Sequence, residues 1–466
     1  MRLPGAPETS GAPNEALPPS PPVPRASRRR IFVIVALATV MVVVAGVVVV
    51  LASNGEGGGG QAKASAPAGA PIAPGPVAQG QAGPAYVPQP DLRFISVGTN
   101  TGQQFTDDQF RVLADNFGVV MFAKFHAGWD ITKQHEAASR LMAMKPDMKV
   151  YPYFSTKYWF DQNRWNGATI NPAWFLRDNQ GKLVGRDRKK DRNKSTAPTL
   201  VDLANPEYRK WALGVMKSWL DAAPYAGIFF DAAEPIGDFG DADVARYAKL
   251  LGPERVKAYN DGMRQLLADA EKLVGPGRSV LFNGIAPSDQ RGPDRNLDLL
   301  QATNGALDEF FCLDSRGNVR GIDADLSLLG QQPDKRFFMR TNYRASLPAA
   351  DRDRLQRLCL GSFLLAWEPG HSSFSFGGDY TADQLGMDPP DSNVNLGAPT
   401  DAYRRTGTLL ERGFANGVVY VNPGTSPQQV VLDAPLTEVR GGKVVATRQA
   451  GETVTVAPGD ASFFVR

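Results

Sequence analysis

Two acidic residues that end apolar segments are the clearest candidates for chemistry in this chain. Asp231 ends a run of apolar and small residues at 226–230, and Glu309 lies in a shorter run at 307–312. A run without polar alternation is typical of a strand buried on both faces, as in a parallel sheet. Such folds bind ligands at the carboxyl ends of their strands, so we expect the two carboxylates to face one another. A proton donor paired with a nucleophile or base is the chemistry of glycoside hydrolysis.

Other acids compete for these two roles. Glu234 lies three residues after Asp231 and could be the working acid instead. Asp308 could replace Glu309, and Glu368 could carry the second carboxylate. The structural hypotheses are that Asp231 caps the next segment of chain and that Glu309 forms an ion pair in a loop. The sequence favours Asp231 and Glu309 as the catalytic pair, with Glu234 and Glu368 as alternates.

Amides, aromatic rings, an arginine and a histidine accompany these acids near the expected strand ends. Aromatic faces stack on sugar rings, and amide or guanidinium groups bond sugar hydroxyls. The expected sugar-binding residues are Tyr151, Tyr153, Trp159, His126, Asn283, Arg340, Tyr343 and Trp367. For the tryptophans at 159, 165 and 174, packing in the core or in a lid is the alternative. The basic stretch at 186–194 fits a solvated loop or a clamp for an acidic polysaccharide.

Eight apolar segments that alternate with amphipathic ones must position these residues. The expected strands lie at 94–97, 119–125, 149–154, 226–231, 279–283, 307–312, 336–340 and 361–367. The expected helices lie at 107–116, 133–144, 207–222, 241–274, 296–301, 323–329 and 349–360. Eight such units predict an α/β fold, a (β/α)₈ TIM barrel that forms the catalytic domain at 91–415. A doubly wound open sheet is the alternative; it usually carries a glycine-rich phosphate turn, which the sequence lacks.

The chain changes character after residue 415. Short β-type segments between 417 and 465 are separated by Pro-Gly, Gly-Gly and Pro-Gly-Asp turns. Turns of this kind join antiparallel strands. Residues 416–466 are therefore predicted to form a small C-terminal antiparallel β-domain.

The start of the chain predicts a membrane anchor. Residues 1–30 are rich in Pro, Ala and Ser, are expected to be disordered, and end in a cluster of arginines. Residues 31–52 are uncharged and rich in Val, and they are long enough to span a bilayer as one transmembrane helix. The positive-inside rule then leaves the N-terminus in the cytoplasm and the catalytic domain outside it. Residues 53–90 form a flexible Gly/Ala/Pro linker. The alternative is a signal peptide cleaved near Ala52, which would give a secreted protein.

Charge and composition disfavour several classes of protein. A formal net charge of +3 over 466 residues, without a basic stripe interleaved with aromatic residues, gives no sign of nucleic-acid binding. Three scattered histidines are too few for a His-built metal site, so no metal and no organic cofactor are expected. Cys312 and Cys359 form no CxxC pattern and lie in apolar surroundings. They are expected to be buried structural thiols.

Seven short motifs give the chain a family resemblance. They lie at 151–154 (Tyr-Pro-Tyr-Phe), 171–174 (Asn-Pro-Ala-Trp), 178–181, 201–206, 227–231, 282–284 and 308–310. Together they resemble the barrels named glycosyl-hydrolase-like family fifteen, over roughly residues 92–415. More distantly, the chain is similar to α-galactosidase-like and polygalactosaminidase-like barrels. The resemblance to the α-galactosidase-like barrels implies a strand-four Asp as nucleophile and a strand-six acid as proton donor. These roles map onto Asp231 and Glu309, although the strand-six acid is Glu here rather than Asp.

These observations predict a membrane-anchored, extracytoplasmic glycoside hydrolase. Its partners would be a polysaccharide or oligosaccharide and, through residues 31–52, the lipid bilayer. The alternative from another class is a non-catalytic glycan-binding barrel that organises surface polysaccharide and needs no acid pair. A deacetylase or other hydrolase is less favoured, because the chain has no His-based metal set and no G-x-S-x-G motif.

Overall fold

The computed structural model describes most of the chain after residue 84. The described residues are 85–87, 89–98, 105–123, 131–159, 170–185, 198–237, 241–285, 296–314, 317–342, 347–377 and 390–466. The N-terminal segment at 1–30, the transmembrane helix expected at 31–52 and nearly all of the linker at 53–90 lie outside them. None of the helices within the described ranges is long and apolar enough to cross a membrane.

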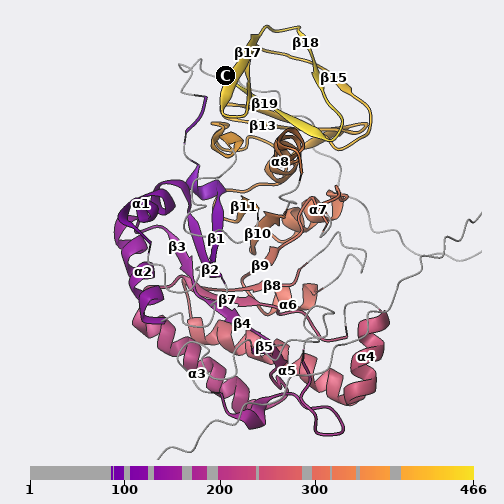
Figure 1. Ribbon diagram of the computed structural model, residues 1–466. Helices are drawn as coiled ribbons and strands as arrows, with labels where there is room; N and C mark the ends of the chain where they lie inside the picture. The colour runs from indigo at the N-terminus through magenta and orange to yellow at the C-terminus, as the bar shows by residue number, and fades with distance from the viewer. Residues whose placement is uncertain are drawn as a thin grey trace, which may run out of the picture. The chain divides into compact units, whose positions relative to one another are not determined.

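Parallel strands form the core (Figure 1). One sheet has the order β1 (Phe94–Gly98), β2 (Val119–Ala123), β3 (Lys149–Tyr151). The other has the order β4 (Tyr153–Ser155), β7 (Gly227–Asp231), β8 (Ser279–Asn283), β9 (Gly305–Asp308), β10 (Arg336–Thr341), β11 (Ser372–Phe376). Every pairing in these two sheets is parallel. The parallel α/β architecture expected from the sequence is therefore confirmed.

Two contacts connect these sheets. Pro152, which has no N–H to donate, separates β3 from β4, so one stretch of chain pairs with β2 on one side and with β7 on the other. At the opposite ends of the strand order, Arg93 forms an isolated parallel bridge with Phe374 of β11. β1, at the edge of the three-stranded sheet, thus lies beside β11, at the edge of the six-stranded sheet.

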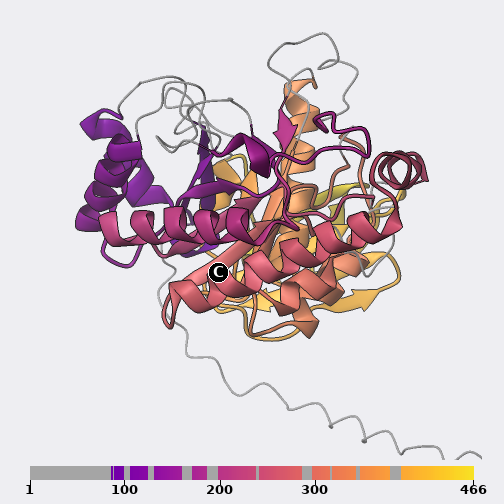
Figure 2. The same ribbon diagram turned by 90° about the horizontal axis from the view of Figure 1, so that it is seen from below.

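Helices follow the strands. They are α1 (Asp107–Asn116), α2 (Ile131–Met144), α3 (Pro206–Ala222), α4 (Asp241–Leu251), α5 (Pro253–Val274), α6 (Leu297–Gln301), α7 (Asp323–Gln331) and α8 (Ala349–Leu364). The side chain of Thr106 and that of Gln109 form a capping box at the start of α1. In α3, Asn205 caps the helix and Pro206 occupies its first position. Figure 2 shows α3 and α5, in magenta and pink, running side by side.

The single helix expected at 241–274 is two helices. Gly252 lies between α4 and α5 with φ 80°, and Pro253 follows it. Proline cannot donate the backbone hydrogen bond that a continuous helix needs, and glycine accepts the left-handed conformation without strain. Short elements complete this part of the described chain. They are the 3-10 helices η1 (Pro90–Leu92), η2 (Pro172–Trp174) and η4 (Pro390–Asn393), and the antiparallel pair β5 (Tyr158–Trp159) and β6 (Thr199–Leu200).

The eighth expected strand, at 361–367, was placed wrongly. Residues up to Leu364 continue α8, and the strand that pairs with β10 is β11, at 372–376. The second half of α8 is buried on all sides, so its sequence lacks the polar face that marks an amphipathic helix. The segment Ser-Ser-Phe-Ser-Phe of β11 is buried throughout although three of its five residues are serines. Its polarity made it resemble a loop.

The C-terminal part is antiparallel, as predicted. One sheet has the order β12 (Arg404–Thr406), β13 (Leu409–Phe414), β14 (Gly417–Asn422), β19 (Asp460–Val465), β16 (Leu436–Arg440), β17 (Lys443–Arg448). β15 (Gln428–Val431) pairs with β18 (Thr453–Val456). Two strands of the larger sheet, β12 and β13, come before residue 416, where the domain was expected to begin. Figure 1 shows α8 beside these strands.

Opposite faces of α8 contact different parts of the chain. On the face toward the C-terminal sheet, the buried Arg357 guanidinium donates from Nε to Asp460 Oδ1 (3.0 Å) and from Nη2 to Oδ2 (2.9 Å). On the other face, Phe363 stacks on Phe374 of β11 with ring centroids 5.4 Å apart. The helix therefore joins the parallel and antiparallel parts of the structure.

The close approach of α8 and β19 depends on Gly361. A Cβ atom there would lie 2.6 Å from Ala461 Cβ and 3.0 Å from Val421 Cγ2. We expect Gly361→Ala to lower the free energy of unfolding by about 1–3 kcal/mol, because overpacking outweighs the better helix propensity of alanine. Urea denaturation measures this change. Gly214→Ala in α3 is the control, because no atom beyond its chain neighbours and its own helix backbone lies within 4 Å of the added carbon. It should be neutral or stabilising by up to about 1 kcal/mol; equal losses in both variants would contradict the packing argument.

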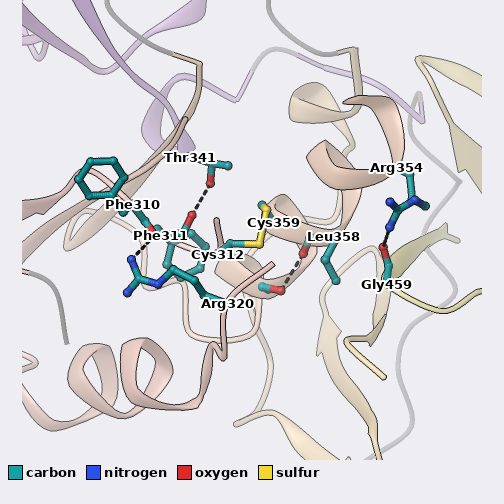
Figure 3. Close-up of a disulfide and its surroundings, with 10 residues drawn as sticks. Phe310, Phe311, Cys312, Arg320, Thr341, Arg354, Leu358, Cys359 and Gly459 are labelled. Carbon is teal, nitrogen blue, oxygen red and sulfur yellow. Dashed lines mark hydrogen bonds between the residues drawn. A yellow bond between two sulfur atoms is a disulfide. The ribbon is translucent and has the colours of Figure 1, made fainter. Parts of the chain in front are cut away.

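The two cysteines form a disulfide, not the separate thiols expected from the sequence. Cys312, in the turn after β9, is bonded to Cys359 in α8, with Cα atoms 5.5 Å apart (Figure 3). They are 47 residues apart, and only the packing of α8 against the sheet brings them together. No local spacing pattern marks such a pair.

Candidate active site

Three polar side chains meet at the carboxyl ends of three neighbouring strands. Asp231 ends β7, Asn283 ends β8, and Glu309 follows the last residue of β9. The Nδ2 of Asn283 lies 2.8 Å from Asp231 Oδ1 and 3.0 Å from Glu309 Oε2, and it donates to both. The two expected acids are thus joined through one amide. Asp231 and Asn283 are partly exposed, and the Glu309 side chain is 29% exposed.

Buried donors from flanking strands fix the orientation of these acids. The hydroxyl of Tyr153, in β4, donates to Asp231 Oδ2. Arg340, in β10, forms an ion pair with Glu309 and donates from Nη2 to Oε1. Both Tyr153 and Arg340 are nearly fully buried, so the sheet holds them in place. Two expected catalytic acids and two expected sugar-binding residues are therefore linked by hydrogen bonds around Asn283. They are Asp231, Glu309, Tyr153 and Arg340.

The separation of the two carboxylates follows from their shared partner. The oxygens of Asp231 and Glu309 that face Asn283 are no farther apart than the sum of its two hydrogen bonds, about 5.8 Å. Neighbouring Asp308 is fully buried, and its Oδ1 accepts from the backbone N–H of Phe310 at 2.8 Å. Glu309 is thus the acid of β9 that reaches the cluster.

The backbone after each strand end is in an unusual conformation. Ala232, directly after Asp231, has φ 54°, and Cys312, three residues after Glu309, has φ 65°. A non-glycine residue in the left-handed region costs about 1–2 kcal/mol, and such strain gathers at functional sites. Gly284, after Asn283, has φ 149°, and a Cβ there would lie 3.2 Å from Glu234 Cγ. Tight turns at the strand ends thus bring the three polar side chains together.

Glu234, the alternate for Asp231, has a partner of its own. Its Oε2 lies 3.0 Å from the Nζ of Lys157, which also donates to the Glu234 carbonyl at 2.9 Å. The Lys157 side chain is only 2% exposed. A buried ammonium held by one carboxylate and one carbonyl is a structural ion pair. Lys157 was not expected from the sequence, since a lone lysine after an apolar segment gives no signal of burial.

Two of the expected sugar platforms are buried in the core. Tyr151, on β3, is fully buried against Phe338, and burial raises the pKa of its hydroxyl. It precedes Tyr153 by two residues, so it points to the same side of the sheet but lies about 6.6 Å deeper. Trp159, on β5, is 3% exposed and packs against Trp211. Neither ring has a face free for a sugar, so both assignments were wrong.

Trp367 and Glu368 lie at the amino ends of the parallel strands, at the edge of the sheet opposite to Asp231. Trp367 stacks on Phe414 of the C-terminal sheet, and Glu368 forms an ion pair with Arg412 at 2.7 Å. Both precede the start of β11, whereas Asp231 ends β7, and the strands are parallel. Glu368 instead lines a cavity of about 620 Å³ together with Tyr403. The wrong position of the last strand caused both errors. His126 and Tyr343 lie outside the described residues.

Replacing Asn283 by Asp tests whether the acids need its amide. The new carboxylate would lie between two others and lose both donated bonds, so we expect about 1–3 kcal/mol less stability at neutral pH. The loss should shrink near pH 4, since the side chain of an aspartic acid, as introduced by this substitution, ordinarily takes up a proton at about that pH. Urea denaturation at both pH values measures it. Asn179→Asp, at an exposed residue whose Oδ1 accepts from Arg255, is the control and should have little effect at either pH. A loss that is equal at both would contradict the charge argument.

A family model matches more than half of the chain. The family is described as hypothetical glycosyl hydrolase family 15, and the match covers residues 142–418. No curated protein matches the chain. Within the described residues, no three His, Cys, Asp or Glu side chains gather in a way that could hold a metal ion.

Several solved structures share a distant likeness with this chain. One is a variant of the glycoside hydrolase domain of PelA from Pseudomonas aeruginosa, with 16% identity, 60% of this chain and 94% of that chain covered, and a TM-score of 0.36. Another is the α-amylase from Geobacillus thermoleovorans complexed with acarbose, with 12% identity, coverage of 81% and 98%, and a TM-score of 0.44. A third is an α-amylase from Anoxybacillus, with 14% identity, coverage of 80% and 97%, and a TM-score of 0.44.

Proposed function

The chain belongs to the hypothetical glycosyl hydrolase family 15, and from this premise we propose that it cleaves a glycosidic bond in a polysaccharide or oligosaccharide with Asp231 and Glu309. The observation that carries the proposal is the pair of partly exposed carboxylates at the carboxyl ends of β7 and β9, joined by Asn283 at the end of β8, the strand between them. Ligand sites of parallel α/β folds lie at this edge. Glycoside hydrolysis needs two acids there, one on each side of the scissile bond.

The separation of the acids favours double displacement. Carboxyl groups about 5–5.5 Å apart are typical of retaining enzymes, and a separation of about 6.5–9.5 Å is typical of inverting enzymes. Here the facing oxygens are at most about 5.8 Å apart, which lies nearer to the retaining range than to the inverting range. One acid protonates the leaving oxygen while the other attacks the anomeric carbon and forms an ester. The first acid then takes a proton from the water that breaks this ester.

The roles follow the resemblance to α-galactosidase-like barrels, with Asp231 as nucleophile and Glu309 as proton donor. Tyr153 and Asn283 hold Asp231 with one oxygen bonded on each side. Arg340 balances the negative charge that Glu309 carries after it gives up its proton. The same ion pair is the one observation that favours the reverse assignment, because a guanidinium also suits a carboxylate nucleophile. His126 and Tyr343 remain candidates for contacts with sugar hydroxyls.

We further propose that the eight strand positions close into a (β/α)₈ barrel. The strand order runs from β1 to β11 through the shared β3–β4 stretch, and the parallel bridge between Arg93 and Phe374 supports closure. Closure places Tyr153, Asp231, Asn283, Glu309 and Arg340 around one mouth. Substrate contacts would then come from the segments that follow the strands.

The proposed location is the outer face of the cytoplasmic membrane. Residues 31–52 would anchor the chain in the bilayer, with the short N-terminus in the cytoplasm and residues 53–90 as a spacer. The disulfide between Cys312 and Cys359 supports this location, because disulfides persist in oxidising compartments. Membrane fractionation with N-terminal sequencing distinguishes the anchor from a secreted form that begins near residue 53.

Incubation with a panel of polysaccharides and oligosaccharides tests the function. Hydrolysis is followed by the appearance of reducing ends, and binding is measured in parallel by calorimetry. The proposal expects new reducing ends from at least one glycan class. A chain that binds glycans without cleaving any of them would instead be a glycan-binding barrel, and the acid pair would have no catalytic role.

A further inference from the structure

The disulfide lies close to one of the two acids. Cys312 is three residues after Glu309, in the turn that connects β9 to the following chain. Resting on the function proposed above, we propose that the Cys312–Cys359 disulfide is a positioning link, which ties the turn at 309–313 to α8 and so sets the place of the Glu309 carboxylate. The disulfide thereby serves catalysis as well as stability.

The contacts of this turn show how a displacement at Cys312 would reach Glu309. Asn342 donates to the Glu309 carbonyl at 2.8 Å, and Thr341 donates from Oγ1 to the Phe311 carbonyl at 2.9 Å. Arg320 donates to the Phe310 carbonyl at 2.6 Å (Figure 3). These bonds hold three successive carbonyls of the turn to Arg320 and to residues 341–342, and Cys312 follows directly after them. A change in the backbone of Cys312 would strain these bonds and, through the two residues between, displace Glu309.

The conformation of Cys312 shows what the disulfide holds. Its φ of 65° is unfavourable for a residue with a side chain. The bond to Cys359 fixes the Cβ of Cys312 relative to α8, so the residue cannot relax to a right-handed or extended conformation. Without the bond, relaxation at this residue would rotate the turn and draw Glu309 away from Asn283.

The other end of the disulfide lies in a buried part of α8. Cys359 is fully buried, and so is the whole second half of this helix. The opposite face of α8 contacts the C-terminal sheet through the Arg357–Asp460 ion pair and through Arg354, which donates to the Gly459 carbonyl at 2.8 Å (Figure 3). Because that face lies away from Cys359, the ion pair can be broken without touching the turn. The chain thus contains a matched control for loss of stability.

The test compares three variants of the full chain. Both cysteines are fully buried, so substitution is a cleaner test than a reductant. We expect Cys312→Ala/Cys359→Ala to lower kcat about 10- to 100-fold with KM changed less than about 3-fold, as for a misplaced catalytic group. Cys312→Gly/Cys359→Ala should recover most of this loss, because glycine accepts the left-handed conformation without the bond. Arg357→Met should lower the Tm while kcat stays within about 2-fold of wild type.

A second readout does not depend on activity. Amide hydrogen exchange of the peptide that spans the turn is measured at short labelling times, where it reports local opening. It should be at least about 10-fold faster in the alanine pair than in wild type, and unchanged in Arg357→Met. Wild-type kcat in the alanine pair, or an equal loss of kcat in Arg357→Met, would overturn the positioning role. If wild type cleaves no glycan, the proposed function fails, and the exchange rates alone decide this proposal: unchanged exchange in the alanine pair overturns it.

Discussion

Asp231→Asn and Glu309→Gln are each expected to lower kcat by about 10²- to 10⁴-fold, the range that a positioned acid or base contributes. Both substitutions keep the shape of the side chain and leave oxygen acceptors for Asn283. Glu309→Gln also removes the charge that pairs with the buried Arg340, so its Tm should fall, and its rates are measured well below that Tm. Steady-state hydrolysis of the best glycan from the panel gives the rates. Glu368→Gln, at the other edge of the sheet, and Glu234→Gln, in the ion pair with Lys157, are the controls. A loss in Glu234→Gln as large as in Asp231→Asn would move the catalytic role to Glu234.

The same two variants assign the roles. A variant that lacks the proton donor still cleaves substrates with a good leaving group. Azide that replaces a missing nucleophile gives a glycosyl azide of inverted configuration, whereas azide that attacks the glycosyl-enzyme ester gives one of retained configuration. We expect Asp231→Asn to give the inverted azide and Glu309→Gln to cleave an activated aryl glycoside and give the retained azide. The opposite pattern would show that the Arg340 ion pair marks Glu309 as the nucleophile.

Arg357→Met is expected to lower the free energy of unfolding by about 3–5 kcal/mol. It would leave the Asp460 carboxylate buried without its guanidinium partner. Among the described residues, the backbone N–H of Ala461 would still donate to this carboxylate at 2.8 Å. The loss is measured by urea denaturation, followed in both the parallel and the antiparallel parts of the chain.

Two further variants separate this ion pair from a general effect of charge removal. Arg357→Met/Asp460→Leu removes both charges and should recover most of the lost stability, because a buried ion pair is worth little more than apolar packing. Lys217→Met breaks an exposed pair with Asp221 in α3 and should cost less than about 1 kcal/mol. A double variant as unstable as Arg357→Met alone would contradict the argument from burial.

Much of the parallel sheet could be predicted from the sequence, because most of its strands are continuous apolar runs. The runs that end at Asp231 and at Asn283 became β7 and β8 with little change. The end of α8 and the position of β11 were predicted wrongly, because complete burial there removes the usual alternation of apolar and polar residues. The end of α8 is apolar on every side, and the strand β11 is rich in serine. In both places the packing of the C-terminal sheet and the neighbouring strands decides the structure, and the sequence carries no local sign of it.

The sequence predicts which polar residues lie at the ends of the strands, but it does not predict how deeply each side chain is buried. Asp231, Asn283 and Glu309 lie together because parallel strands end at one edge. Tyr151 and Tyr153 share a side of the sheet, and only the depth of each layer decides that Tyr153 reaches Asp231 while Tyr151 stays in the core. The disulfide could not be foreseen, since it depends on how α8 packs.

The stereochemistry of the first product tests the central claim most directly, that Asp231 and Glu309 act as a close pair through Asn283. Proton NMR of the anomeric signals, recorded before the released sugar mutarotates, shows which anomer forms first. The spacing of at most about 5.8 Å predicts that the anomeric configuration is retained. A product of inverted configuration would require a water between the acids and the sugar, and it would contradict the geometry proposed for this site.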